Sequence, residues 1–259
     1  MGNELQGKVA IVTGGANGIG RAIAEVFVEE GARVVIADLD DDAGRVAAAE
    51  LGDAVRFVHT DVSDPDSVQA AIDFAQEELG PLQVMVNNAG ISGSYRRLMQ
   101  DDLRDFDRVI AVDLKGVMVG TQRAAGAMGE GGSIINITSI AGMAPGIGFS
   151  SYRAAKAGVI HFSRCAAIEV AELGVRVNVI APGNISTDIN AAFDTSSIVR
   201  RIQPLQRLGS TRDIANAAVY LASERAAQVT GILIPVDGGT TAGPPPIKFE
   251  DVSAPNTDE

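Results

Sequence analysis

The sequence predicts an α/β protein built on a doubly wound parallel sheet of about seven strands, with helices on both faces. Short apolar runs rich in β-branched residues recur along the chain, and their apolar residues are continuous rather than alternating. Helical patterns separate successive runs. Continuous apolar strands indicate a sheet covered on both faces, and right-handed crossovers between parallel strands make such a sheet doubly wound.

Seven runs are expected to form strands, at residues 8–13, 33–38, 55–59, 82–87, 133–138, 176–181 and 232–236. Helices are expected over 20–30, over 40–51, from about residue 64, over 101–128 and over about 150–173. Ser63 or Asp64 is a suitable cap for the third helix, and Pro65 suits its first turn. Residues 184–209 break the alternation and are expected to form either a lid over the site or a packed surface excursion.

Composition and charge exclude several classes of protein. Lys and Arg number 21 against 33 Asp and Glu, which gives a net charge of −12. No nucleic-acid partner is expected, because such binding needs a basic face. No apolar run reaches roughly eighteen residues, so no membrane partner is expected either. The acidic, proline-led residues 243–259 are expected to be poorly ordered or to lie across a neighbouring subunit.

The cysteine and histidine usage argues against metal and disulfide chemistry. Cys165 is the single cysteine, and we expect it to be a small apolar core residue. A chain without an intrachain disulfide or a secretory signal suits the reducing cytoplasm. His59 and His161 are each isolated, so no metal site is expected.

A glycine-rich turn follows the first expected strand and precedes the first expected helix. It reads TGGANGIG over residues 13–20. Glycines there let the backbone turn sharply and approach a pyrophosphate, which then lies on the free N–H groups at the positive end of the helix. In this position the turn predicts a dinucleotide site on a Rossmann-type sheet. The residues of the turn expected to bind the cofactor are Gly14, Asn17, Gly18, Ile19 and Gly20.

Asp38, at the end of the second expected strand, favours NAD as the cofactor. A carboxylate at this place accepts hydrogen bonds from both hydroxyls of the adenosine ribose and repels a 2′-phosphate. Leu39 and three aspartates follow directly, with no Arg or Lys among them.

Tyr152 and Lys156 stand four residues apart at the start of the long helix that follows the fifth strand. This spacing places the phenol and the ammonium on one helix face. A tyrosine, whose reference pKa is about 10, needs a nearby cation to act as an acid–base catalyst at neutral pH. Ser139, at the end of the fifth strand, can hydrogen-bond a substrate oxygen beside Tyr152.

From about Lys8 to Gly239 the chain resembles the short-chain dehydrogenase/reductase family, in its short single-domain branch. The matching motifs are the glycine turn, Asp61-Val62, Asn87-Asn88-Ala89-Gly90, Ser139, Tyr152-Arg153-Ala154-Ala155-Lys156, Pro182-Gly183 and Val236-Asp237-Gly238-Gly239. The resemblance implies one dinucleotide-binding and catalytic domain over residues 1–242. It also implies hydride transfer between NAD(H) and a secondary alcohol or ketone, with Tyr152 passing the proton and Ser139 orienting the oxygen.

The resemblance further assigns positions around the cofactor. Asp61 and Val62 would hold the adenine, and Lys156 would bind the nicotinamide ribose. Asn87 is expected to tie strands together rather than to bind. The remaining positions expected to line the cofactor are Asn88, Ala89, Gly90, Pro182, Gly183, Ile185 and Thr187.

Asp113 departs from the family pattern, which usually has Asn as the fourth member of the catalytic set. Its backbone carbonyl can still hold a water molecule, but its carboxylate adds negative charge near Lys156. We expect a proton relay that survives with altered pH dependence. The alternative is that Asp113 is a neutral variation, which serves only in helix packing and leaves the reaction unchanged.

Family geometry places mostly apolar side chains around the substrate, which predicts an uncharged, hydrophobic or alicyclic alcohol or ketone. The expected substrate residues are Ser92, Ser139, Ile140, Met143, Phe149, Tyr152, Asn184, Ile189 and Phe193. No Arg or Lys is among them to bind an anion. Tyr95, Arg96 and Arg97 are expected in a solvated loop, with contact to the substrate as the alternative.

Two alternatives stay open, and a third is disfavoured. One is a hydroxysteroid or ring-diol dehydrogenase of the same family, and another is a non-catalytic NAD-binding protein, for which Asp113 is the hint. A reductase of carrier-bound acyl chains is disfavoured, because such enzymes usually prefer NADP and an acidic chain repels an acidic carrier. The resemblance also implies a homotetramer.

Overall fold

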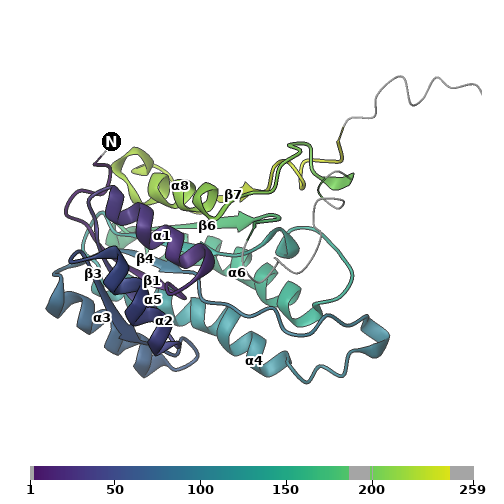
Figure 1. The fold of residues 1–259 in the computed structure, drawn as a ribbon, viewed down its shortest axis with the longest axis horizontal. Coiled ribbons are helices and arrows are strands. Elements are labelled where there is room, and N and C mark those ends of the chain that lie inside the picture. The colour runs from purple at the N-terminus through teal and green to yellow at the C-terminus, as the bar shows by residue number, and fades with distance from the viewer. Residues whose placement is uncertain (1–2, 187–198, 200, 246–259) are drawn as a thin grey trace, which may run out of the picture.

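We describe the protein from a computed structural model, which describes residues 3–186, 199 and 201–245. Within this part of the chain, seven strands form one sheet in the order β3-β2-β1-β4-β5-β6-β7, and every neighbouring pair is parallel. The expected doubly wound parallel fold is confirmed (Figure 1). The strands are β1 (Val9–Thr13), β2 (Arg33–Asp38), β3 (Val55–His59), β4 (Leu82–Asn87), β5 (Ser133–Ile137), β6 (Arg176–Pro182) and β7 (Leu233–Val236).

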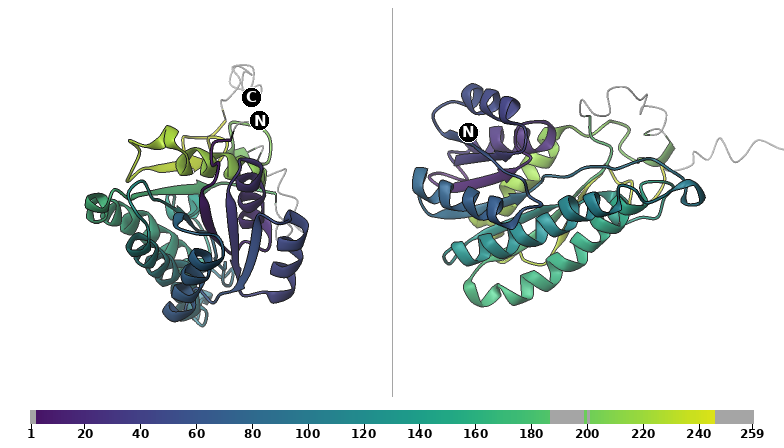
Figure 2. Two further views of the ribbon diagram at one scale, coloured as in Figure 1. Left: turned by 90° about the vertical axis from the view of Figure 1, so that its left-hand side faces the viewer. Right: turned by 90° about the horizontal axis from the view of Figure 1, so that it is seen from below.

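Helices connect the strands and cover both faces of the sheet (Figure 2). The α-helices are α1 (Gly18–Glu29), α2 (Asp41–Leu51), α3 (Pro65–Glu78), α4 (Phe106–Ile110), α5 (Gly116–Ala127), α6 (Ser150–Glu169) and α8 (Thr211–Ala222). Short 3₁₀ turns lie at η1 (Leu98–Gln100), η3 (Ile140–Gly142), η4 (Ala171–Leu173) and η6 (Glu224–Ala226), and η2 (Ala111–Lys115) is a π-helical turn.

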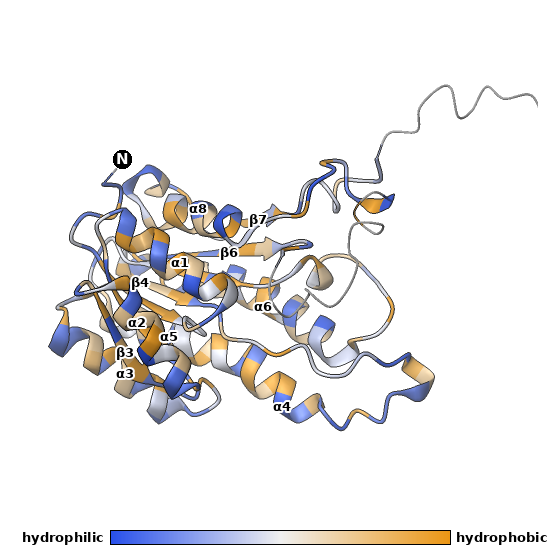
Figure 3. Cartoon of the chain, in the orientation of Figure 1, coloured by the Kyte–Doolittle hydropathy of each residue, from blue (hydrophilic) through white to orange (hydrophobic). Residues whose placement is uncertain are grey.

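Two buried clusters lie on opposite faces of the sheet, because successive side chains of a strand point to opposite sides. On one face, Val12 of β1 lies in a cluster with Phe27 of α1 and Ile214 of α8. On the other face, Ile11 of β1 lies in a cluster with Ile72 of α3 and residues of α5 and α6. Figure 3 shows the resulting pattern, with apolar strands inside and polar residues on the outer helix surfaces.

The expected continuous helix over 101–128 is wrong in its first part. Residues 101–105 are not helical, and the helix begins at Phe106 and is interrupted by the π-turn η2. Asp101 Oδ1 accepts a hydrogen bond from the Leu103 N–H at 3.0 Å, and Asp102 Oδ1 accepts one from the Arg104 N–H at 3.3 Å. Such local side-chain bonds compete with helix formation.

Helix α8 was not expected from the sequence, although a capping box marks its start. Ser210 Oγ accepts a hydrogen bond from the Asp213 N–H, and Asp213 in turn accepts one from the Ser210 N–H. Ser followed three residues later by an acidic residue, before an apolar run, is a sequence signature of a helix start.

The expectation for Cys165 is wrong, because its thiol is exposed. On α6 the buried face carries Ser163 and Ala167, and Cys165 falls on the outer face with Ile168, which is 80% exposed. Within residues 3–186, 199 and 201–245, no helix combines the length and the apolar character needed to cross a membrane.

Candidate active site

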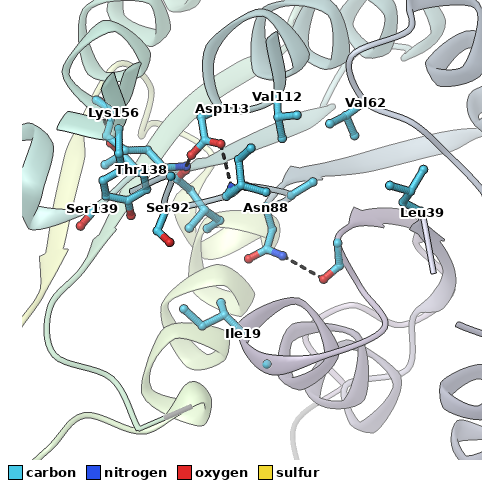
Figure 4. A pocket seen from close by; sticks show the side chains of 18 of the residues that line it. Ile19, Leu39, Val62, Asn88, Ser92, Val112, Asp113, Thr138, Ser139 and Lys156 are labelled. Atoms are coloured by element: carbon cyan, nitrogen blue, oxygen red, sulfur yellow. Dashed lines mark hydrogen bonds and ion pairs between the residues drawn. The ribbon is translucent and has the colours of Figure 1, made fainter. Parts of the chain in front are cut away.

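A cavity of about 1280 Å³ lies at the carboxyl ends of the strands (Figure 4). Ligands bind at this edge in open α/β sheets, where the strand order reverses. Here the order reverses between β1 and β4, which are neighbours in the sheet. The sequence-predicted cofactor residues that line the cavity are Gly14, Asn17, Gly18, Ile19, Asp38, Leu39, Asp61, Val62, Asn88, Ala89, Gly90, Tyr152, Lys156, Pro182, Gly183 and Ile185.

The predicted catalytic residues lie together at the same cavity, since Ser139, Tyr152, Lys156 and Asp113 all line it. Of the further substrate residues, Ser92 lines it, whereas Ile140, Met143 and Phe149 are not among the lining residues. Asn184 lines a second cavity of about 300 Å³ instead. Thr187, Ile189 and Phe193, and much of the expected 184–209 lid, lie outside the described residues.

Several lining residues were missed from the sequence. They are Thr60, Ser63, Gly93, Asp105, Arg108, Val112, Ile137 and Thr138. Thr60, Ser63 and Thr138 follow directly on motifs or strand ends, so their positions could have been inferred. Arg108 places a positively charged side chain in the cavity lining, whereas no Arg or Lys was expected among the substrate residues.

The glycine turn is shaped for a close approach of another molecule. Gly14 and Gly18 adopt positive φ values of 62° and 56°, where residues with a side chain are strained. Gly20 does not line the cavity, but a Cβ there would lie 2.1 Å from the Gly14 carbonyl oxygen. Helix α1 begins at Gly18 without a side-chain cap and without an acidic residue in its first turn. Its N-terminal N–H groups are thus available for an anion such as a pyrophosphate.

Asn88 fixes the glycine turn from the neighbouring strand. Its Nδ2 donates to the Thr13 carbonyl at 2.9 Å and to the Gly14 carbonyl at 3.1 Å. The Asn88 and Ala89 N–H groups both donate to Thr13 Oγ1, at 2.9 and 3.1 Å. Asn87 is buried and its Nδ2 donates to Asn136 Oδ1 at 2.8 Å, so its expected role in tying strands together is confirmed.

Two carboxylates are held in place at the ends of β2 and β3. Asp38 Oδ2 accepts a hydrogen bond from the Ala16 N–H at 2.9 Å, and its Oδ1 accepts one from the Asp40 N–H at 3.1 Å. Asp61 Oδ1 accepts hydrogen bonds from the hydroxyl and the N–H of Ser63, at 2.7 and 2.9 Å. These bonds to Ser63 hold the pKa of Asp61 below its ordinary value.

Asp113 and Lys156 form a buried ion pair, with Asp113 Oδ2 3.1 Å from Lys156 Nζ. Asp113 is fully buried, and its Oδ1 accepts a hydrogen bond from the Ile91 N–H at 2.8 Å. Burial raises the pKa of Asp113 above its ordinary value, while the Lys156 ammonium and the Ile91 N–H oppose that shift. Lys156 Nζ also donates to the Ile137 carbonyl at 3.4 Å. The expectation that a carboxylate lies beside Lys156 is confirmed.

Ser139 and Tyr152 come from the end of β5 and the first turn of α6. Ser139 Oγ accepts a hydrogen bond from the Ala141 N–H at 3.1 Å, which caps the turn η3. Lys156 Nζ lies 5.5 Å from the centre of the Tyr152 ring. The i, i+4 spacing thus brings the cation and the phenol to one helix face, as expected. Figure 4 shows Ser139 on the same side of the cavity as Lys156. A group of at least three potential metal ligands does not occur among the residues described.

Comparison with known proteins shows a family for almost the whole chain. A family model described as enoyl-(acyl carrier protein) reductase matches residues 14–241. The 2,5-dichloro-2,5-cyclohexadiene-1,4-diol dehydrogenase LinX of Sphingobium indicum is 40% identical over 94% of this chain and its own entire length. Cis-4-hydroxycyclohexanecarboxylate dehydrogenase of Sinomonas cyclohexanicum is 42% identical over 93% of this chain and its own entire length.

A third relative is the 3-alpha-(or 20-beta)-hydroxysteroid dehydrogenase of Mycobacterium bovis, which is 39% identical over 94% of this chain and 93% of its own. Family members of this kind generally use a nicotinamide cofactor, and the glycine turn with its open helix N-terminus fits the pyrophosphate of such a group. The chain therefore belongs to the short-chain dehydrogenase/reductase family and is an oxidoreductase acting on CH–OH groups.

Proposed function

We propose that the protein transfers a hydride between NAD(H) and an alicyclic secondary alcohol or its ketone. The observation that carries this proposal is one continuous cavity that is lined by Asp38 beside the glycine turn, by Ser139 after β5, and by Tyr152 and Lys156 of α6. The related proteins named above act on ring alcohols, which supports a ring-shaped substrate here.

The choice of NAD rests on the charges around Asp38. Its carboxylate is oriented by two backbone N–H groups and leaves lone pairs for the two ribose hydroxyls. The basic side chains near the turn and the following helix are already paired, since Arg21 contacts Glu50 and Arg45 lies 2.5 Å from Asp41. A 2′-phosphate would thus meet a negative carboxylate without a free cation to offset it.

The proposed mechanism assigns one task to each polar residue. Ser139 Oγ donates a hydrogen bond to the substrate oxygen and orients it. Tyr152 takes the hydroxyl proton when the alcohol is oxidised and returns it when the ketone is reduced. Lys156 stabilises the phenolate form of Tyr152 by its positive charge and can bind the ribose next to the nicotinamide. The cofactor, when bound, accepts or supplies the hydride.

Asp113 is proposed to modify this proton relay without abolishing it. Its carboxylate lies against the same ammonium that serves Tyr152, so it offsets part of the positive charge. The pH dependence of turnover should therefore differ from that of a variant with a neutral amide at this position. A protein that binds NAD without turnover is the contrasting candidate, and Asp113 is the feature that favours it.

A panel assay tests the proposal. Formation of reduced cofactor is followed with NAD or NADP and with cyclic alcohols, ring diols, hydroxysteroids and open-chain secondary alcohols. Tyr152→Phe should lower kcat on the order of 10²–10⁴-fold, because it removes the proton-transfer group. Tyr220→Phe is the matched control, since Tyr220 lies on α8 outside the cavity. Tight NAD binding with no turnover of any alcohol would favour the binding-protein candidate.

We also propose a cytoplasmic homotetramer. Exposed apolar side chains on the outer faces of α5 and α6, Met118 at 42% and Ile168 at 80%, support burial of these helices against further copies. The free thiol of Cys165 suits a reducing compartment. Size-exclusion chromatography at the mass of one 26.8 kDa chain would contradict the tetramer.

A further inference from the structure

Arg108 brings a positive charge to the cavity that the proposed mechanism does not use. Two positively charged side chains, Lys156 and Arg108, are among the described residues that line the cavity. The Lys156 ammonium lies 3.1 Å from the buried Asp113 carboxylate, so its charge is largely offset within the protein. The Arg108 side chain is exposed, and in the part of the chain that the structure describes it takes part in no ion pair and no side-chain hydrogen bond. Its guanidinium group is thus accessible to an anion that enters the cavity.

The carboxylate nearest to Arg108 in the cavity lining along its own helix already has another partner. Asp105 precedes Arg108 by three residues and also lines the cavity, but its Oδ2 accepts a hydrogen bond from the Ser94 hydroxyl. A Cβ at Gly93 would lie 3.1 Å from Val109 Cγ2 and 3.7 Å from Asp105 Cβ, so the chain that leaves β4 packs closely along α4. Asp105 therefore bonds to this chain, and Arg108 is left for a ligand.

The helix places Arg108 at some distance from the proton-transfer groups. Arg108 and Val112 are four residues apart, and both line the cavity, so they lie on one helix face. Five residues separate Arg108 from Asp113, the partner of Lys156, which corresponds to a rise of about 7.5 Å along a helix. Helical side chains lean toward the N-terminus, which carries the guanidinium further from Lys156. An anionic group bound by Arg108 would thus stand on the order of 8 Å or more from the reacting oxygen.

The pyrophosphate of the cofactor has a different binding place. The uncapped start of α1 at Gly18 supplies free N–H groups for it. Figure 4 shows Ile19 of this turn well apart from Val112, which stands one helical turn after Arg108. The chain packed along α4 instead carries Ser92, an expected substrate residue that lines the cavity. Arg108 is therefore placed to meet the substrate.

We propose that Arg108 binds an acidic group of the substrate, which makes the substrate a ring alcohol, or its ketone, with a carboxylate about 8 Å or more from the reacting oxygen. This inference rests on the proposed function and adds a charge to its substrate. A planar guanidinium group matches a carboxylate, because it offers two parallel N–H donors. The chain carries a net charge of −12, so an anionic substrate needs a local cation to offset the repulsion.

The experiment compares 3-(4-hydroxycyclohexyl)propanoate with its amide, which has the same shape without the charge. In Arg108→Gln, the ratio of kcat/KM for the acid to that for the amide should fall about fivefold to thirtyfold, mainly through KM for the acid, because a charge-assisted hydrogen bond is lost. Arg108→Lys keeps the charge without the planar fork and should retain part of the ratio. Arg104→Gln is the matched control, since Arg104 is exposed, contacts Asp102 and lies outside the cavity lining.

An unchanged ratio in Arg108→Gln would overturn the inference. An equal fall in Arg104→Gln would overturn it too, because the change in net charge alone then explains the result. If KM for NAD rises in Arg108→Gln while the ratio stays the same, Arg108 serves the cofactor and the inference fails.

Failure of the inference and failure of the proposed function are distinguishable. If neutral ring alcohols are oxidised and the acid is not, the inference alone fails. If no ring alcohol of either kind is oxidised, the proposed function fails, and binding of the acid to the protein loaded with NADH, measured by saturation-transfer NMR, tests the anion site separately. Binding that weakens in Arg108→Gln but not in Arg104→Gln supports the anion site, and equal binding in all three proteins contradicts it.

Discussion

The two ends of the cavity are built in different ways. At the glycine-turn end, the ends of β1, β2 and β4 carry Thr13, Asp38 and Asn88, and hydrogen bonds to the main chain fix these groups. At the Tyr152 end, part of the wall comes from irregular chain, since Ile91, Ser92 and Gly93 follow β4 and line the cavity outside any helix or strand. A site fixed by strand ends is set by the fold itself, whereas loop walls can change without disturbing the sheet. The glycine-turn end therefore suits a common cofactor, and the Tyr152 end suits a particular substrate.

The largest effect at the glycine-turn end is expected for Asp38→Asn. The amide keeps the shape but loses the negative charge that we propose to select NAD, so the ratio of kcat/KM for NAD to that for NADP should fall about tenfold to a hundredfold. Steady-state kinetics with each cofactor measure this. Asp42→Asn is the control, because the Asp42 side chain is fully exposed on α2. If the ratio of kcat/KM for NAD to that for NADP is unchanged in Asp38→Asn, the Asp38 charge does not determine which cofactor is used.

Gly20→Ala tests whether the glycine-turn end is as closely packed as the structure shows. The added Cβ would meet the Gly14 carbonyl at 2.1 Å and Asn88 Nδ2 at 2.5 Å. The free energy of unfolding should fall by about 1–3 kcal/mol, as for other overpacked sites, and cofactor binding should weaken. Denaturant titration and cofactor fluorescence measure the two effects.

Gly126→Ala is the matched substitution for that test. A Cβ at this helical position in α5 would have nothing within 4 Å. It should raise the free energy of unfolding by about 0.5–1 kcal/mol, because alanine favours the helix more than glycine does. Equal behaviour of the two variants would show that the turn tolerates a side chain.

The contrast between the two ends also explains what the sequence could predict. The strands and the residues at their carboxyl ends, such as Asp38 and Asn88, follow from apolar runs and from glycine spacing, which are local patterns. The contact of the Tyr95 ring with Gly148 depends on the paths of two separate loops, and no periodic pattern encodes it. Phe149 was expected beside the substrate only by resemblance, and its left-handed backbone, with a φ of 54°, has no sequence signature.

Errors in the predicted elements have the same origin. The helix expected from Asp101 was wrong because Asp101 and Asp102 hydrogen-bond the following backbone, so local side-chain chemistry overrides the apolar period. Arg108 was missed as a cavity residue because its orientation depends on where α4 begins, five residues after the expected start. Lys156, in contrast, was correctly expected beside Asp113, because its motif position lies on the regular helix α6.

Asp113→Asn is expected to have a moderate effect at the Tyr152 end. Removing the carboxylate 3.1 Å from Lys156 Nζ leaves more of the ammonium charge to favour the phenolate form. The acidic limb of kcat/KM should move to lower pH by roughly one unit, a change of about 1.4 kcal/mol. A pH–rate profile identical to that of the unsubstituted protein would leave Asp113 with a packing role alone.

Stability should also depend on Asp113 in a defined direction. Burial raises the pKa of its carboxyl, so the folded protein binds this proton more tightly than the unfolded chain. The stability that the proton contributes is present below the ordinary Asp pKa and is lost as pH rises through the raised value. The difference in free energy of unfolding between the protein and Asp113→Asn should therefore shift in favour of the variant as pH increases. Denaturant titrations from acid to neutral pH measure it.

A small effect, on stability alone, is expected for Ser210→Ala, which tests the boundary between the two ends. Ser210 follows Gly209, which forms a β-bridge with the cavity residue Ile185, and it caps α8, which packs against α1, the helix that follows the glycine turn. Loss of the capping hydroxyl should lower the free energy of unfolding by about 1 kcal/mol while kcat stays unchanged, whereas Ser210→Thr should retain the stability.

The pH dependence of this cap sharpens the test. Arg207 and the Ser210 N–H hold the pKa of Asp213 below its ordinary range, so Asp213 stabilises the folded state above the ordinary Asp pKa and loses that contribution as pH falls toward the lowered value. The destabilisation caused by Ser210→Ala should thus be larger near neutral pH than in acid, where the box is partly dismantled already. A loss of stability that is equal at both pH values would contradict this account of the cap. A clear fall in kcat in Ser210→Ala would mean that the start of α8 belongs to the substrate end and does not only support the glycine turn.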